Sequence, residues 1–87
     1  MTVTEQIRER LAALAPEQIE LIDESSKHAG HAGARDGGGH FRLRIVASAF
    51  AGLRIMQRHR LVYDALGPLM KREIHALSIE AFAPGER

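Results

Sequence analysis

The sequence predicts an α+β domain, a two-layer sandwich in which helices cover one face of a three-stranded mixed sheet. Two stretches repeat apolar residues at helical spacing, and three stretches alternate apolar and polar residues as half-buried strands do. Their order is helix, strand, strand, helix, helix, strand, with a connection before the last strand that is long enough to cross over. With 87 residues, a single domain spanning 1–87 is expected.

The first helix is predicted from an apolar stripe near the amino terminus. Its members recur at spacings of four, four and three: Val3, Ile7, Leu11 and Leu14. Thr2 and Glu5 fit a capping box at its start. A proline at position 16 disfavours helical geometry in the preceding residue, so the helix should stop near Ala15. Residues 17–24 partly alternate and predict the first strand.

The stretch 25–39, SSKHAGHAGARDGGG, holds five of the eight glycines and predicts a loop. After it, Phe41, Leu43 and Ile45 alternate with arginines, which is the clearest strand pattern in the chain. That strand should bury one face.

The second helical stripe follows Gly52 and consists of Ile55, His59, Val62 and Leu66. Gly67 and Pro68 interrupt it, so a second, short helix is expected near 68–73. The third strand is predicted from alternation in residues 75–81, and this parity groups His75 with the inward-facing Leu77 and Ile79.

Composition excludes several functions. Twelve basic and eleven acidic residues leave a net charge of +1, which gives no overall attraction to nucleic acid or anionic lipid. The absence of cysteine excludes disulfides, thiol catalysis and any thiolate metal site built from this chain alone. No signal-like or membrane-spanning run is present, so a cytoplasmic protein is expected.

Ser25 and Ser26 precede His28, but no acid is placed to orient that imidazole, so no enzyme is predicted.

Four blocks of the sequence resemble the BolA family. HFRLRIVASAFAG at 40–52, QRHRLVYDAL at 57–66 and IHALSIEAFAP at 74–84 look like its signature blocks, and DESSKHAGHAGAR at 23–35 looks like its variable loop. The resemblance covers nearly the whole chain and implies a class II KH-like αββααβ fold. One departure is Gly38 with Gly39, where the family carries a Glu or Ser beside a Ser or Thr. A polar contact at the start of the second strand is therefore expected to be missing.

The resemblance also implies a role in iron–sulfur cluster assembly or trafficking. In the family a monothiol glutaredoxin is the partner, and a [2Fe–2S] cluster is shared with it and with glutathione, so the isolated chain should hold none. His75 matches the shared ligand, although its pattern alone favours a structural histidine at a strand end. His28 matches the loop ligand and His31 is the alternative, while the pattern alone also allows solvated loop histidines.

The donor chemistry agrees with a partnership. A cluster held by one chain usually takes four thiolates, whereas two imidazoles can ligate one iron of a [2Fe–2S] unit if thiolates hold the other iron. The partner must supply those thiolates. Of the other histidines, His59 lies in the helical stripe and is expected to be partly buried, and His40 begins a strand, where a structural role is expected.

The competing hypothesis is a DNA-binding transcriptional regulator that uses the KH-like fold. KH domains clamp nucleic acid with a GxxG loop between paired helices, but here that junction reads GPLM from Gly67 to Met70. A GxxG does occur at 30–33, between two strands. The candidate basic surface, for DNA or for an acidic partner, consists of Arg54, Arg58, Arg60, Lys71 and Arg72. Whether the chain pairs with a second copy stays open.

Overall fold

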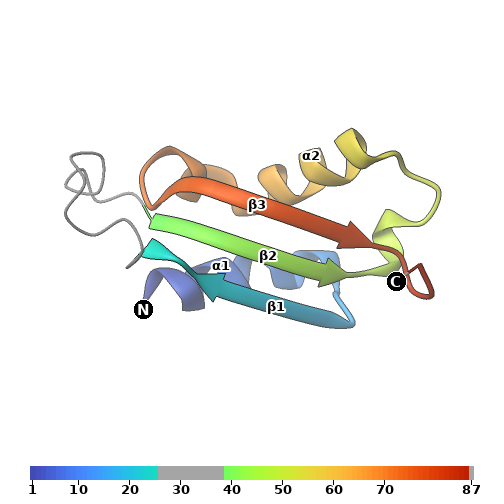
Figure 1. The fold of residues 1–87 in the computed structure, drawn as a ribbon, viewed down its shortest axis with the longest axis horizontal. Helices are drawn as coiled ribbons and strands as arrows, with labels where there is room; N and C mark the ends of the chain where they lie inside the picture. The colour runs from blue at the N-terminus through green and yellow to red at the C-terminus, as the bar shows by residue number, and fades with distance from the viewer. Residues whose placement is uncertain (26–38, 87) are drawn as a thin grey trace.

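The computed structural model describes residues 1–25 and 39–86, and it confirms the predicted order of elements (Figure 1). The helices and strands are α1 (Val3–Leu11), η1 (Ala12–Leu14), β1 (Gln18–Asp23), β2 (Gly39–Val46), η4 (Ser48–Phe50), α2 (Ile55–Leu66), η5 (Gly67–Lys71) and β3 (Ile74–Phe82). The short helix expected near 68–73 is the 3-10 helix η5. Its proline, which lacks an N–H, stands in the first turn, where a helix tolerates it.

The three described strands form one mixed sheet in the order β1-β2-β3. β1 pairs with β2 in antiparallel register, and β2 pairs with β3 in parallel register. The crossover through α2 and η5 makes this parallel pairing possible, as the length of the connection predicted. The α+β, two-layer architecture is therefore confirmed.

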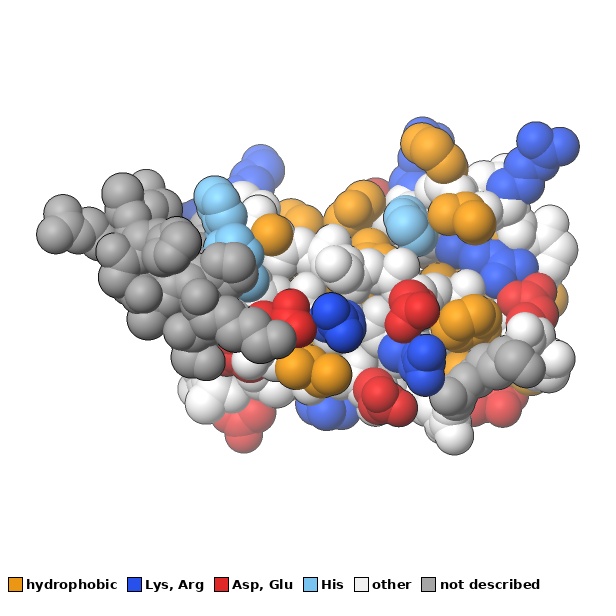
Figure 2. All heavy atoms as spheres, viewed as in Figure 1, with side chains coloured by type: hydrophobic (Ala, Val, Ile, Leu, Met, Phe, Trp, Pro, Cys, Tyr) orange, Lys and Arg blue, Asp and Glu red, His pale blue; other side chains and the backbone are white. Residues whose placement is uncertain are grey.

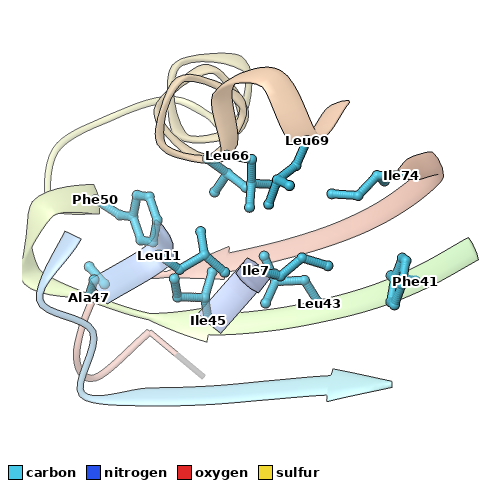
Figure 3. Close-up of a cluster of buried hydrophobic side chains, with 12 residues drawn as sticks. Ile7, Leu11, Phe41, Leu43, Ile45, Ala47, Phe50, Leu66, Leu69 and Ile74 are labelled. Atoms are coloured by element: carbon cyan, nitrogen blue, oxygen red, sulfur yellow. The ribbon is translucent and has the colours of Figure 1, made fainter. Parts of the chain in front are cut away.

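The core lies between the two helices and one face of β2 and β3, and Figure 3 shows side chains from these elements pointing toward one another. The largest fully buried side chains come from both predicted helical stripes, the central strand and η4: Ile7, Leu11, Val62, Leu66, Leu43, Ile45 and Phe50. Burial of one such side chain stabilises a fold by roughly 1.5–3 kcal/mol. These contacts fix the sheet against the helices and so position its ends.

The first helix begins and ends as predicted. The backbone N–H of Glu5 donates to Thr2 Oγ1 over 3.1 Å, and the N–H of Thr2 donates to Glu5 Oε1 over 2.8 Å. The helix narrows into η1 and stops at Ala15, which takes a left-handed conformation with φ of 49° before Pro16. In the described part of the chain, no helix has the length and apolar character needed to cross a membrane.

The pairing of β2 with β3 contains a bulge at its start. Gly39 pairs with Ile74, but the next residue, His40, pairs with Ala76. His75 is therefore an extra residue in β3 with no counterpart in β2. A bulge of this kind re-aims a side chain and breaks the alternation along the strand.

The bulge overturns one expectation from the sequence. Strict alternation placed His75 on the inward face with Leu77 and Ile79, but His75 is exposed. Ile74 takes the buried position instead, at 2% exposure. The assignment was wrong because the period of two holds only while the ladder is uninterrupted.

Candidate functional site

Two imidazoles lie together at the end of the sheet where β2 and β3 begin. The ring centroids of His40 and His75 are 5.1 Å apart, and their planes are tilted by 42°. His40 is half-buried and His75 is exposed. Figure 2 shows histidine side chains gathered at this end of the molecule. The two rings are therefore close neighbours, at a separation ordinary for a pair of rings in contact.

Backbone hydrogen bonds hold the surroundings of this pair. The N–H of His40 donates to Ser25 Oγ over 3.0 Å, and the N–H of Glu24 donates to the His40 carbonyl over 2.7 Å. The N–H of Gly39 donates to the carbonyl of Glu73 over 2.9 Å. The end of β1, the start of β2 and the residue before β3 are thus tied together. The imidazole pair stands on a fixed backbone.

Ser25 supplies the polar contact that the sequence suggested was missing here. Its backbone N–H also donates to Asp23 Oδ1 over 2.8 Å. Hydrogen bonds from the side chain and then the backbone of Ser25 lower the pKa of Asp23. At Gly39 a Cβ would lie 2.5 Å from the ring of Phe41, so a larger residue there requires that ring to shift.

The loop histidines of the sequence analysis, His28 and His31, lie outside the described residues. The flanking residues Ser25 and Gly39 both adjoin the imidazole pair. Across 1–25 and 39–86, no group of three or more histidine, aspartate or glutamate side chains gathers in a way that could hold a metal ion. The described part of the site is therefore a pair of donors.

His40 is the member of this pair that sequence reasoning assigned to a structural role. A signal was present, because alternation along β2 places His40 on the face opposite Phe41 and hence outside the core. Its nearness to His75 depends on parallel pairing with a bulge, which links residues 35 positions apart. His59 is half-buried on α2, in agreement with its place in the helical stripe.

The five basic residues proposed as a surface differ in exposure and in hydrogen bonding. Four of them are exposed: Arg54, Arg60, Lys71 and Arg72. Arg58 differs, since its side chain is only 12% exposed. Its Nε donates to the Leu53 carbonyl over 2.9 Å, and its Nη1 donates to the Ala81 carbonyl over 3.0 Å.

Arg58 also forms a two-pronged ion pair with Glu86, in which Nη2 donates to Oε2 over 2.9 Å and Nη1 donates to Oε1. This pairing raises the pKa of Arg58. It lowers the pKa of Glu86 to about 2, with help from the backbone N–H of Ala83. The guanidinium thus joins α2 to the end of β3, and its donors are used inside the fold.

These features define a small α+β domain whose mixed three-stranded sheet presents an imidazole pair at one end. The family model described as "BolA-like protein" matches residues 11–86. The chain therefore belongs to the BolA-like family, as its sequence blocks indicated.

The relatives differ in the share of their length that this chain covers. SufE-like protein 1 of Arabidopsis thaliana is 49% identical over 92% of this chain, which covers 23% of that protein. BolA-like protein 1 of Mus musculus is 45% identical over 85% of this chain and 52% of its own length. The DNA-binding transcriptional regulator BolA of Escherichia coli is 35% identical over 94% of this chain and 76% of its length. The chain thus spans about half or less of the first two relatives.

The solved structure of the BolA domain of SufE1 from Arabidopsis thaliana has the same fold. It is 48% identical, and its TM-score is 0.82 over 95% of this chain and 93% of that domain. The architecture is therefore that of solved BolA structures.

Proposed function

We propose that this protein is a non-enzymatic, cytoplasmic factor of iron–sulfur cluster assembly or trafficking that shares a [2Fe–2S] cluster with a monothiol glutaredoxin. The observation that carries the proposal is the pair of His40 and His75, 5.1 Å apart at an end of the sheet, in a chain without cysteine. The cluster is cargo. Two imidazoles suit one iron, and thiolates from the partner's cysteine and glutathione suit the other.

His75 is the first proposed ligand because the bulge exposes it on a fixed strand. The second ligand is His28, with His31 as the alternative, and His40 is a third candidate that the described geometry adds. Ser25, whose Oγ accepts from the N–H of His40, precedes His28 by three residues, a chain length of at most about 11 Å. Six residues span at most about 22 Å, which makes His31 the less constrained choice.

Anaerobic reconstitution of the chain with a monothiol glutaredoxin and glutathione tests the proposal. We expect a coloured heterodimer whose visible absorption and circular dichroism require both proteins. The chain reconstituted alone, under the same conditions, is the control and should bind no stoichiometric cluster. A full cluster on the isolated chain would contradict the shared-ligand arrangement.

DNA binding is the second candidate function, favoured by the name of the Escherichia coli relative and by the exposed Arg54, Arg60, Lys71 and Arg72. With so few phosphate contacts, binding to duplex DNA should be weak and should fall steeply with salt. Fluorescence anisotropy at several salt concentrations measures this. Sequence-specific binding that survives physiological salt would establish the regulator role in place of the cluster role.

A further inference from the structure

The chain turns back after β3, as Figure 1 shows. The turn runs from Ala83 to Glu86 and is closed by a hydrogen bond of 3.1 Å from the N–H of Glu86 to the carbonyl of Ala83. Its central residues are Pro84 and Gly85, and Gly85 has a φ of 87°. A proline followed by a glycine with positive φ is the pair that a type II turn favours. The sequence APGE thus encodes a turn that carries the Glu86 carboxylate back to Arg58.

Three N–H groups converge on that carboxylate. Nη1 of Arg58 and the N–H of Ala83 donate to Oε1 of Glu86, the second over 2.9 Å, and Nη2 donates to Oε2 over 2.9 Å. The guanidinium itself is fixed, because Nε and Nη1 also donate to the carbonyls of Leu53 and Ala81. A fixed guanidinium that donates through two nitrogens matches the geometry of a carboxylate. The donors therefore suit a carboxylate, whichever molecule carries it.

These donors lie at a partly enclosed place. Arg58 and Glu86 line a groove of about 560 Å³ between α2 and the last residues of β3, and the side chain of Arg58 is only 12% exposed. The other carboxylate of the groove, Glu80, pairs with Arg44 at 3.4 Å. Hydrogen bonds to charged groups strengthen where water is partly excluded. The pKa of Glu86 is lowered to about 2, so its side chain is ionised at neutral pH.

We propose that Arg58 and the N–H of Ala83 form a carboxylate-binding site, which the chain keeps closed with its own Glu86. The turn from Ala83 to Glu86 is then a latch, because it supplies an internal ligand and excludes an external one. A group on a short tether has an effective concentration of about 1 mM or more, whereas a free carboxylate loses translational freedom when it binds. A carboxylate of another molecule therefore reaches Arg58 only when the latch opens.

An ordinary surface ion pair is the competing interpretation. Such pairs join exposed side chains and contribute little to stability. Here the arginine is nearly buried, and the carboxylate arrives on a turn with its own sequence requirement. A Cβ built on Gly85 would have no atom within 4 Å, so glycine serves the conformation of the turn and not a tight contact. Turn and donors together favour the latch.

Formate is the probe that tests the site, and Glu86→Ala is the variant that empties it. We expect the melting temperature of Glu86→Ala to rise with sodium formate and to saturate, with an apparent Kd on the order of tens of millimolar. The parent should not respond, because its site is filled. Sodium chloride at equal ionic strength is the control for screening. The matched control variant is Glu80→Ala, which removes the other carboxylate of the groove and should not respond to formate.

The double variant Arg58→Met with Glu86→Ala separates the possible outcomes. It lacks the guanidinium, so the response to formate should disappear. A response that persists in the double variant, or that is absent from Glu86→Ala, overturns the site. A parent that responds as strongly as Glu86→Ala overturns the latch.

Hydrogen exchange tests the latch with Glu86 in place. Gly85→Ala puts a Cβ on a residue with a φ of 87°, which strains the turn without a clash. Exchange of the Ala83 N–H should become about tenfold faster or more, because its acceptor is Glu86 Oε1. The N–H of Glu24, which donates to the His40 carbonyl, is the internal control and should exchange as in the parent. Unchanged exchange at Ala83 overturns the role of the turn.

Discussion

The polar side chains near the two ends of β3 differ in burial and in hydrogen bonding. Where the strand ends, Arg58 donates to two backbone carbonyls and to Glu86, and its side chain is 12% exposed. Where the strand begins, His75 is exposed in a bulge and its ring lies beside His40. At one end the arginine side chain joins elements of the fold, and at the other two imidazoles lie together with one of them at the surface.

The two ends differ in whether backbone hydrogen bonds or the polar side chain itself holds the neighbouring elements together. Near His75, hydrogen bonds from Gly39 and His40 fix the strands but leave the ring of His75 at the surface. Near Arg58, the side chain itself is the link between α2 and β3. A polar side chain that completes the fold is a poor candidate for a ligand site. A polar side chain that stays at the surface, on strands held by other hydrogen bonds, is a good candidate for a ligand site.

The sharpest contrast is between the histidines at the two ends. His75→Ala should abolish the histidine-ligated spectrum of the heterodimer, yet change stability by no more than about 0.5 kcal/mol because the side chain is exposed. The matched control is His59→Ala, which should keep the spectrum but lose up to about 3 kcal/mol if its half-buried ring packs in the helical stripe. Visible circular dichroism beside thermal melts measures both. An unchanged spectrum for His75→Ala removes the central residue of the proposal.

The second ligand should show a smaller effect. His28→Ala is expected to weaken the spectrum, and His28→Ala with His31→Ala to weaken it further, because the proposal lets His31 replace His28 at an ordering cost of roughly 1–2 kcal/mol per residue. Titration of reconstituted complexes by circular dichroism gives the order. If His40→Ala alone matches the double variant, the second ligand is His40.

Gly39→Ala probes the backbone under the imidazole pair. The added Cβ would lie 2.5 Å from the Phe41 ring, so overpacking should cost about 1–3 kcal/mol in urea unfolding. The double variant with Phe41→Leu removes the ring and should recover part of that loss. If the losses from Gly39→Ala and Phe41→Leu simply add in the double variant, the ring contact is not what makes alanine costly at position 39.

The smallest effect concerns the ion pair at the other end and depends on pH. The folded pKa of Glu86 is about 2, below its ordinary value of 4.5, so its stabilisation is present above pH 4.5 and is lost as the pH falls toward 2. Glu86→Gln should therefore lower the melting temperature at pH 7, and the deficit should disappear near pH 2. Arg58→Met should share this profile, and the double variant should lose no more than one alone. A deficit that is constant with pH would point to packing instead of charge.

Much of the fold follows from local pattern. The stripes of Ile7 with Leu11 and of Val62 with Leu66 mark the helices, and the alternation of Leu43 with Ile45 marks the central strand. Thr2 and Glu5 form the capping box that marks the start of α1, and both lie within one stretch of four residues. Each of these signals is carried by residues close in sequence, which is why the sequence alone is sufficient for them.

The contacts that could not be predicted join segments that lie far apart in the sequence. Arg58 and Glu86 are 28 positions apart, and nothing near either residue indicates the other. The bulge depends on Gly39 meeting Ile74 in a parallel pair. Without that register, the alternation assigned His75 to the core and left His40 as a strand-end residue. Sequence pattern therefore did not predict the geometry that brings His40 and His75 together.

The bulge in β3 exposes His75 but makes the pairing of the strand irregular. If His75 were deleted, Ile74 would directly precede Ala76, and the inward and outward positions would alternate without a break through Leu77. A shortened chain of this kind should melt at the same temperature or higher, because its ladder would be regular, but it would lack the exposed imidazole. The fold thus keeps a residue that the regular ladder does not need, and it is the residue whose imidazole the bulge exposes.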